Sequence, residues 1–125
     1  MKPITALIAS LTLLLFGCAT QNTSLEGTYT LTELTAHEAP ENASVTMTVT
    51  PDRIGGKGPI NNWNGPLTDG KIGMIISTKK AGPPELMKME NAFFQAIDGT
   101  SLELDGDMLH LVKDGTTVAV FQRTE

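Results

Sequence analysis

The sequence predicts an α+β fold, in which a mainly antiparallel, barrel-like sheet of seven to eight short strands carries one packed helix. Several short stretches alternate apolar and polar residues, as strands with one buried face do. Asp-Gly pairs, which favour tight hairpin turns, begin at Asp69, Asp105 and Asp114 between such stretches. One stretch, from Glu85 to Ile97, instead carries apolar residues at helical spacing. A length of 125 residues suits one domain.

Residues 1–17 are predicted to be a lipoprotein signal peptide. Met1 and Lys2 supply a positive start, and Pro3 to Phe16 is mostly apolar. That length fits the apolar part of a signal peptide and is short for a membrane span. The segment ends in Leu15-Phe16-Gly17-Cys18, which resembles the bacterial lipobox. The resemblance implies that the Cys18 thiol receives diacylglycerol, that cleavage precedes it, and that the new amine is acylated.

Cys18 is the only cysteine, so the chain cannot form an intramolecular disulfide. An inert thiol is the alternative to lipidation, but the signal, the small residue and the cysteine occur in the required order. Several acyl chains hold a membrane stably, and residues 18–24 then form the lipidated cysteine and a short polar tether. Ala19 stands where an aspartate would favour the inner membrane in the enterobacterial pattern. We therefore expect the outer membrane, with the domain facing the periplasm.

The first expected strands lie before the glycine-rich part of the chain. Gly27 to Leu34 alternates, with Tyr29 and Leu31 on one face. A polar loop at 35–42 follows, and Val45 to Val49 alternates again. Both stretches are predicted to be half-buried strands of the domain at 25–125.

The middle of the chain is predicted to be a shaped loop from Arg53 to Leu67, because Gly and Pro interrupt it repeatedly. Glycine permits positive φ there, and asparagine bonds nearby backbone. Lys71 to Thr78 is the next expected strand. Its run Met74-Ile75-Ile76 suggests burial on both faces near its centre.

The last part of the chain contains the helix and three strands in a meander, at 101–104, 108–112 and 116–123. The helix stripe comprises Leu86, Met89, Phe93 and Ala96/Ile97, and Phe94 lies off it. Pro83 and Pro84 suit a helix start, and Gly99 suits the position just past its end. The stripe is expected to cover the sheet, because a lone helix in a β domain must bury its apolar face.

This pattern resembles the META domain, also called the HslJ-like heat-shock lipoprotein family, over nearly all of Leu25 to Arg123. The family opens with a Gly-x-(Trp/Tyr)-x-Leu strand, which Gly27, Tyr29 and Leu31 match, and its central Cys-Asn-x-(aromatic)-x-Gly signature aligns with Ile60, Asn61, Trp63 and Gly65. Its Thr-x-x-x-Cys segment aligns with Thr78 and Gly82. Its helical glutamate corresponds to Glu90, and its closing Leu-x-Leu strand to Leu102 and Leu104.

Both family cysteines are replaced, one by Ile60 and the other by Gly82. Their joint absence suits a pair that lie near one another, and it removes any redox role. The resemblance implies no established enzymatic activity. It implies an association with heat shock, envelope stress, antibiotic tolerance, and secretion or motility.

Candidate reactive groups are few. His37, Glu38 and Glu41 could bind a metal, but solvated loop residues fit their spacing better, and His110 is expected to face solvent from a strand. Gly55 to Gly58 lacks the Gly-Lys-Ser/Thr ending of a phosphate loop. We therefore expect no catalytic residue, no metal and no other cofactor. A net charge of -5 without a basic stripe argues against nucleic acid.

Asn61, Trp63, Gly65 and Glu90 form the expected structural or binding loop. Trp63 could stack on a sugar or peptide if exposed, but a buried plug of the sheet is favoured. Glu90 could be a lone general base, yet a buried carboxylate that accepts from backbone N–H groups of the glycine-rich loop fits better. We expect a monomeric, non-enzymatic, lipid-anchored envelope protein that supports or binds another envelope protein under stress. The alternative is a module that binds a small ligand or cell-wall fragment.

Overall fold

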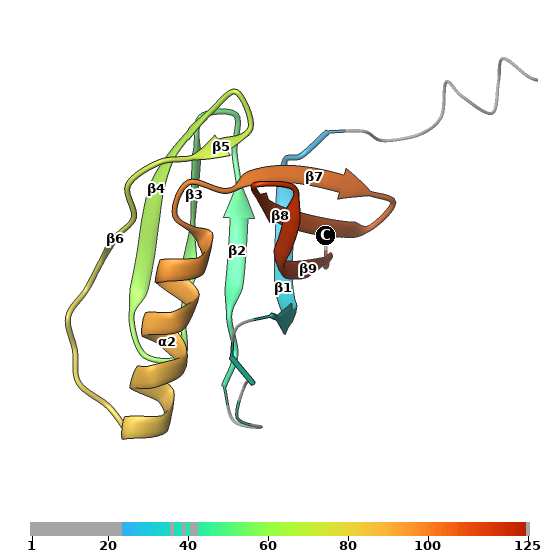
Figure 1. Ribbon diagram of the computed structural model, residues 1–125. Coiled ribbons are helices and arrows are strands. Elements are labelled where there is room, and N and C mark those ends of the chain that lie inside the picture. The colour runs from blue at the N-terminus through green and yellow to red at the C-terminus, as the bar shows by residue number, and fades with distance from the viewer. Residues whose placement is uncertain (1–23, 36, 39, 41–42, 125) are drawn as a thin grey trace, which may run out of the picture.

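A computed structural model of the chain describes residues 24–35, 37–38, 40 and 43–124 (Figure 1). Nine strands and one helix follow one another in these residues: β1 (Gly27–Leu34), β2 (Thr46–Val49), β3 (Arg53–Lys57), β4 (Asn62–Thr68), β5 (Lys71–Ile72), β6 (Ile76–Ser77), α2 (Pro84–Ile97), β7 (Ser101–Asp105), β8 (Met108–Lys113) and β9 (Thr116–Arg123).

Eight of the strands close into an antiparallel barrel. Their order is β3-β2-β1-β9-β8-β7-β5-β4, and the pairing of β3 with β4 completes the ring. The remaining strand, β6, pairs with the same edge of β4 as β5 does, at Trp63 and Asn64 of β4, whereas β5 pairs at Leu67 and Thr68. The predicted α+β fold with a barrel-like sheet and one helix is therefore confirmed.

The interior of the barrel is filled by side chains. Alternate residues of β4 and β8 point inward and are buried. The large buried side chains come from seven of the eight barrel strands: Tyr29, Met47, Ile54, Trp63, Ile72, Leu109, Leu111 and Phe121. All the buried core residues of the described chain lie between Tyr29 and Phe121. The barrel domain therefore contains its own core.

Helix α2 lies against the barrel on the side of β3 and β4 in the view of Figure 1. Met89, Phe93 and Ile97 are buried on its inner face, as the spacing predicts. The Phe93 ring meets Trp63 edge to face, with ring centroids 5.3 Å apart. Gly99 has φ of 77°, so it ends the helix in the left-handed conformation expected of a residue just past the last turn. No helix within the described part of the chain is long and apolar enough to cross a membrane.

All three predicted Asp-Gly hairpins join neighbouring strands, but at the pair that begins at Asp105 only Gly106 has a positive φ, 62°. Asp69 and Gly70 have φ of 52° and 76°, and Asp114 and Gly115 have φ of 52° and 79°. Two successive positive φ values define the turn whose twist matches that of paired strands. These turns connect β4 to β5 and β8 to β9.

The prediction that Arg53 to Leu67 is a loop is wrong, because most of it forms β3 and β4, paired from Arg53↔Pro66 to Lys57↔Asn62. The glycines permit close approach of strands here. A Cβ at Gly56 would overlap the carbonyl oxygen of Thr46 on β2. Only residues 58–61 form the connection, so glycine in this stretch marks tight strand packing rather than a loop.

The expected strand from Lys71 to Thr78 is interrupted, and the prediction that its centre is buried on both faces is wrong. It comprises β5 and β6 with a break at 73–75, and Met74 is 76% exposed and Ile76 62% exposed. The break lies opposite Pro66, whose carbonyl oxygen accepts from the N–H of Gly73 but which has no N–H to donate. A regular ladder cannot continue across that position.

Candidate functional site

The best-defined polar site is a set of hydrogen bonds between helix α2 and the connection from β3 to β4. Glu90, only 4% exposed, projects from the helix toward this connection. Its Oε2 accepts from the backbone N–H groups of Ile60 at 2.9 Å and of Asn61 at 2.7 Å. The expected role of Glu90 as a buried acceptor for loop N–H groups is what the structure shows.

Asn61 extends this set to a third segment. Its side-chain amide donates to Oε1 of Glu90 at 2.7 Å and to the carbonyl oxygen of Lys80 at 3.2 Å. Its Oδ1 accepts from the hydroxyl of Thr78 and from the backbone N–H of Lys80, both at 2.8 Å. Asn61 therefore joins the connection, the helix and the irregular segment that follows β6. We call Asn61, Glu90 and Thr78 the clamp.

The clamp depends on a glycine. A Cβ at Gly58 would lie 2.7 Å from Oε2 of Glu90, so a larger residue would displace the carboxylate. The Gly58 N–H donates to the carbonyl oxygen of Asn61 at 2.7 Å, which closes the turn. Glycine is thus required where the buried carboxylate reaches the backbone.

The hydrogen bonds of the clamp show what the Glu90 carboxylate does in the fold. A carboxylate has about four acceptor sites, and donors of the chain itself take three of those of Glu90. Both Glu90 oxygens already accept from groups of the chain itself, and both polar atoms of the Asn61 side chain have partners. The arrangement satisfies buried backbone groups and leaves its acid directed at the protein.

Trp63 is buried, with 2% of its surface exposed, so the interpretation as a plug is confirmed. Its ring packs on Phe93 and on Phe94, whose centroid lies 6.4 Å away. Phe94 thus joins the core although it lies off the main stripe of the helix. The buried indole N–H has no partner within the described residues, so ring packing holds Trp63 in place.

Gly65 gives the neighbouring segment room to pass. A Cβ there would lie 3.0 Å from the Ile75 side chain and 3.0 Å from the carbonyl oxygen of Met74. The glycine of the signature therefore accommodates the irregular residues between β5 and β6, and it makes no contact that points to a ligand.

Ile60 and Gly82, where the resemblance places two cysteines, are neighbours in the structure. A Cβ at Gly82 would lie 2.7 Å from Cδ1 of Ile60, so the isoleucine side chain occupies the space above the glycine. The expectation that the two positions are neighbours is confirmed.

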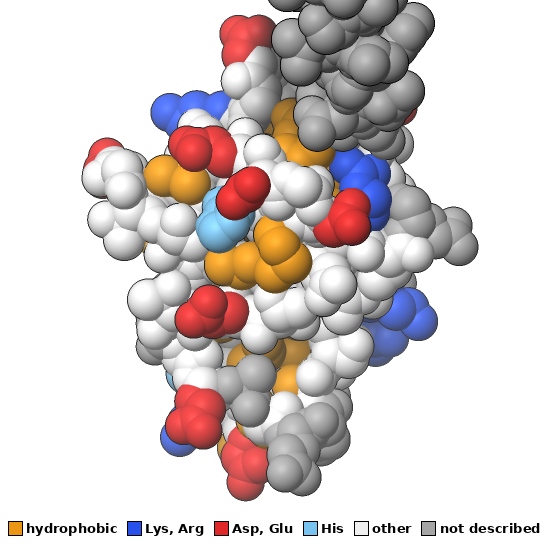
Figure 2. Space-filling view, turned by 90° about the vertical axis from the view of Figure 1, so that its right-hand side faces the viewer, with side chains coloured by type: hydrophobic (Ala, Val, Ile, Leu, Met, Phe, Trp, Pro, Cys, Tyr) orange, Lys and Arg blue, Asp and Glu red, His pale blue; other side chains and the backbone are white. Residues whose placement is uncertain are grey.

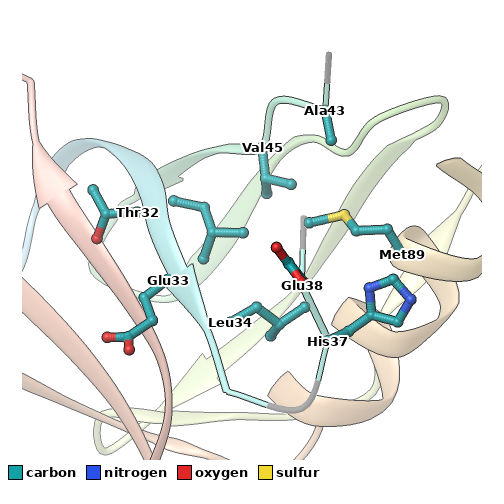
Figure 3. Close-up of a pocket in the computed structure, with 9 residues that line it drawn as sticks. Thr32, Glu33, Leu34, His37, Glu38, Ala43, Val45 and Met89 are labelled. Atoms are coloured by element: carbon teal, nitrogen blue, oxygen red, sulfur yellow. The ribbon is translucent and has the colours of Figure 1, made fainter. Parts of the chain in front are cut away.

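A second candidate site is a cavity of about 310 Å³ near the end of β1 (Figure 3). Residues of β1, the following loop, the segment just before β2 and helix α2 surround it: Leu31, Thr32, Glu33, Leu34, His37, Glu38, Ala43, Val45 and Met89. His37 is half-buried, and its Nδ1 is buried with no hydrogen-bond partner among the described residues. The sequence did not predict this cavity, because its residues are distant in the chain and match no motif.

The remaining candidates stay apart. His110 is half-exposed on β8, on the face opposite the buried Leu109 and Leu111. Among the residues described, no group of three His, Cys, Asp or Glu side chains is arranged to hold a metal ion. Cys18 and Glu41 lie outside the described residues.

Figure 2 shows the face of the molecule on the right-hand side of Figure 1. Hydrophobic side chains appear there as small, separate patches between acidic, basic and polar ones. Large docking surfaces are usually continuous apolar patches. The part of this face formed by described residues does not have that character.

Comparison with known proteins identifies one relationship. The family model described as the META domain matches residues 22–125, which includes the whole barrel and the clamp. No curated protein and no solved structure gives a significant match.

Proposed function

Because the chain belongs to the META domain family, we propose that it is a lipid-anchored bacterial envelope protein that acts by binding another envelope component rather than by catalysis. The observation that supports the non-enzymatic part is that the clamp side chains bond to one another and to the chain's own backbone. The polar residues that match the family signature, Asn61 and Glu90, bond one another and the backbone around them. A catalytic pair would instead direct a free acid or nucleophile toward a substrate.

The anchoring part rests on the N-terminal sequence. Leu15-Phe16-Gly17-Cys18 follows an apolar stretch of signal-peptide length. The barrel begins at Gly27, so residues 18–24 supply a tether between the lipid and the domain. With Ala19 after the cysteine, we place the anchor in the outer membrane and the domain in the periplasm, where it supports envelope components under stress.

A second candidate function is the binding of a small ligand, and the cavity near β1 favours it. Small-molecule sites usually combine an apolar lining with a few polar groups, at volumes of about 300 Å³ or more. The cavity of about 310 Å³ beside His37 and Glu38 has this composition.

Mass spectrometry of the full-length protein extracted from membranes tests the anchoring. We expect a mature chain that begins with an acylated Cys18, and we expect Cys18→Ala to leave the membrane fraction. A soluble, unmodified wild-type chain, or one that begins elsewhere, would contradict the proposal.

Crosslinking in intact cells tests binding. The anchored wild type should crosslink reproducibly to one envelope component, and Cys18→Ala should lose that product because the tether holds the domain near its partner. Equal crosslinking by both forms would show that the anchor does not bring the two together.

A further inference from the structure

The cavity near β1 contains polar groups that the fold itself does not use. Figure 3 shows the Glu38 carboxyl among the surrounding side chains, with the His37 ring beside Met89 of helix α2. Nδ1 of His37 is buried and unpartnered, and Glu38 forms no hydrogen bond or ion pair with any described residue. A carboxylate accepts hydrogen bonds only, and Nδ1 accepts when the imidazole proton is on Nε2. With the imidazole proton on Nε2, the described residues of the lining offer two acceptors that a ligand can use, Nδ1 of His37 and the Glu38 carboxylate.

The rest of the lining is apolar and well ordered by the core. Val45 and Met89 are each 1% exposed and Leu34 is 8% exposed, so packing holds these walls in place. Leu31 and Ala43 complete the apolar part. An empty apolar cavity of about 150 Å³ can hold benzene. The space of about 310 Å³ therefore accepts a ring or short branched chain together with a polar group.

We propose that this cavity binds a small ligand that carries a protonated amine on a compact apolar body. The ammonium group donates to the Glu38 carboxylate and to Nδ1 of His37, and the hydrocarbon body packs against the apolar lining. Charge-assisted hydrogen bonds of this kind are stronger than neutral ones. The inference rests on the proposed binding role and specifies the ligand class for its small-ligand form.

The charges at the cavity select against anions. Glu33 and Glu38 both belong to its lining, and Lys and Arg are absent from the described residues that line it. An anionic ligand would meet two carboxylates without a compensating cation. The chain as a whole carries a net charge of -5, which also favours cations.

The position of the cavity indicates a water-soluble ligand. Leu31 and Leu34 lie in the last part of β1, whereas Gly27, the strand residue nearest in sequence to the predicted tether, begins it. Seven residue steps along a strand span about 23 Å. The ligand is therefore expected to enter from the aqueous side, away from the anchored end.

An NMR titration of the mature chain with Cys18→Ala tests the proposal. The probes are phenethylamine, the neutral 2-phenylethanol and the anionic 3-phenylpropanoate, which share an aromatic body. We expect saturable shifts at cavity residues such as Leu31 and Val45 with the amine. We expect binding at least about tenfold weaker with the alcohol and none with the acid, because only the amine gives charge-assisted bonds.

Glu38→Gln should weaken amine binding about tenfold or more, because it removes the charge while keeping the shape. Glu103→Gln is the matched control, since Glu103 is an exposed acid on β7 outside the cavity lining, and it should bind like the parent chain. If Glu38→Gln fails to fold, the comparison of the three probes on the parent chain, which keeps Glu38, still tests the proposal.

Three results would overturn the ligand assignment: equal binding of the amine and the alcohol, chemical-shift changes outside the cavity, or amine binding that Glu38→Gln leaves unaltered. So would the absence of a saturable shift at millimolar amine. A membrane-anchored, acylated Cys18 would leave the proposed envelope role intact in each of these cases.

Discussion

The change of Asn61 to alanine tests whether the signature residues hold the fold together. Asn61 is 6% exposed and joins three segments through its side chain. Its removal leaves Oε1 of Glu90 without its donor from Asn61 at 2.7 Å. The backbone N–H of Lys80 and the hydroxyl of Thr78 lose their acceptor at the same time. We therefore expect a large loss of stability.

The magnitude follows from these bonds. A hydrogen bond to a charged group contributes about 1.5–3 kcal/mol, and a neutral one about 0.5–1.5 kcal/mol. Lys80 and Thr78 are exposed enough for water to replace part of what they lose. We expect Asn61→Ala to reduce the free energy of unfolding by about 3 kcal/mol. For a domain of this size, the melting temperature then falls by roughly 12–24 °C.

Thermal unfolding followed by circular dichroism measures the effect. Asn62→Ala is the matched control, because Asn62 is exposed and only its backbone takes part in the hydrogen bonds around it. We expect the control to change stability by less than about 0.5 kcal/mol. Equal melting temperatures for the two variants would refute the clamp, and a stable Asn61→Ala that has lost a ligand or partner would favour a binding role for Asn61.

Three further results are expected. Gly56→Ala should lower the free energy of unfolding, measured by chemical denaturation, by about 3 kcal/mol, because the new Cβ would overlap the Thr46 carbonyl oxygen. The control Gly106→Ala, whose Cβ faces open space at φ of 62°, should lower it by roughly 1–2 kcal/mol. Equal losses would contradict the tight strand contact. Burial raises the pKa of Tyr29, the only tyrosine, above its usual 10.0, so an ultraviolet titration should show ionisation above that pH. The folded chain then holds this proton more tightly than the unfolded chain, so the contribution to stability is complete below pH 10 and is lost as the pH rises through the folded pKa; ionisation at or below 10.0 would contradict the burial. The chain from Asn22 onward should elute as a monomer whose melting is unaffected by reductant, since no cysteine remains; an oligomer or a reductant effect would contradict this.

Alternation and turn chemistry predicted most of the fold. The Asp-Gly pairs at Asp69 and Asp114 adopt the positive φ values that their turns require. The helix follows its apolar stripe, since Met89 and Phe93 must cover the sheet. These features depend on residues close together in sequence, and local chemistry is enough to specify them.

Long-range contacts explain where the sequence was misleading. Gly55 and Gly56 suggest a loop on local grounds. They lie in a strand instead, because the neighbouring strands approach too closely for a side chain at these positions. Ile75 and Ile76 suggest a buried strand, yet Pro66 on the partner strand interrupts the pairing. Neither effect can be seen without knowing which segments are adjacent.

Of the two candidate sites, the clamp was predicted from the sequence and the cavity was not. The resemblance to the family pointed to Asn61, Trp63 and Glu90, and the clamp brings Asn61 and Glu90 together as structural residues. The cavity beside His37 and Glu38 had no signal beyond two adjacent polar residues in a loop. Its apolar walls come from β1, the segment just before β2 and helix α2, so only the folded chain assembles it.

The most direct test of the account is a double-mutant cycle between Asn61 and Glu90. Unfolding of wild type, Asn61→Ala, Glu90→Gln and the double variant in urea can be followed by the fluorescence of Trp63, the only tryptophan. If the two side chains form one structural clamp, the double variant should lose about 1–3 kcal/mol less than the sum of the single losses. Losses that add to within about 0.5 kcal/mol would show that the two residues act independently and would contradict the clamp.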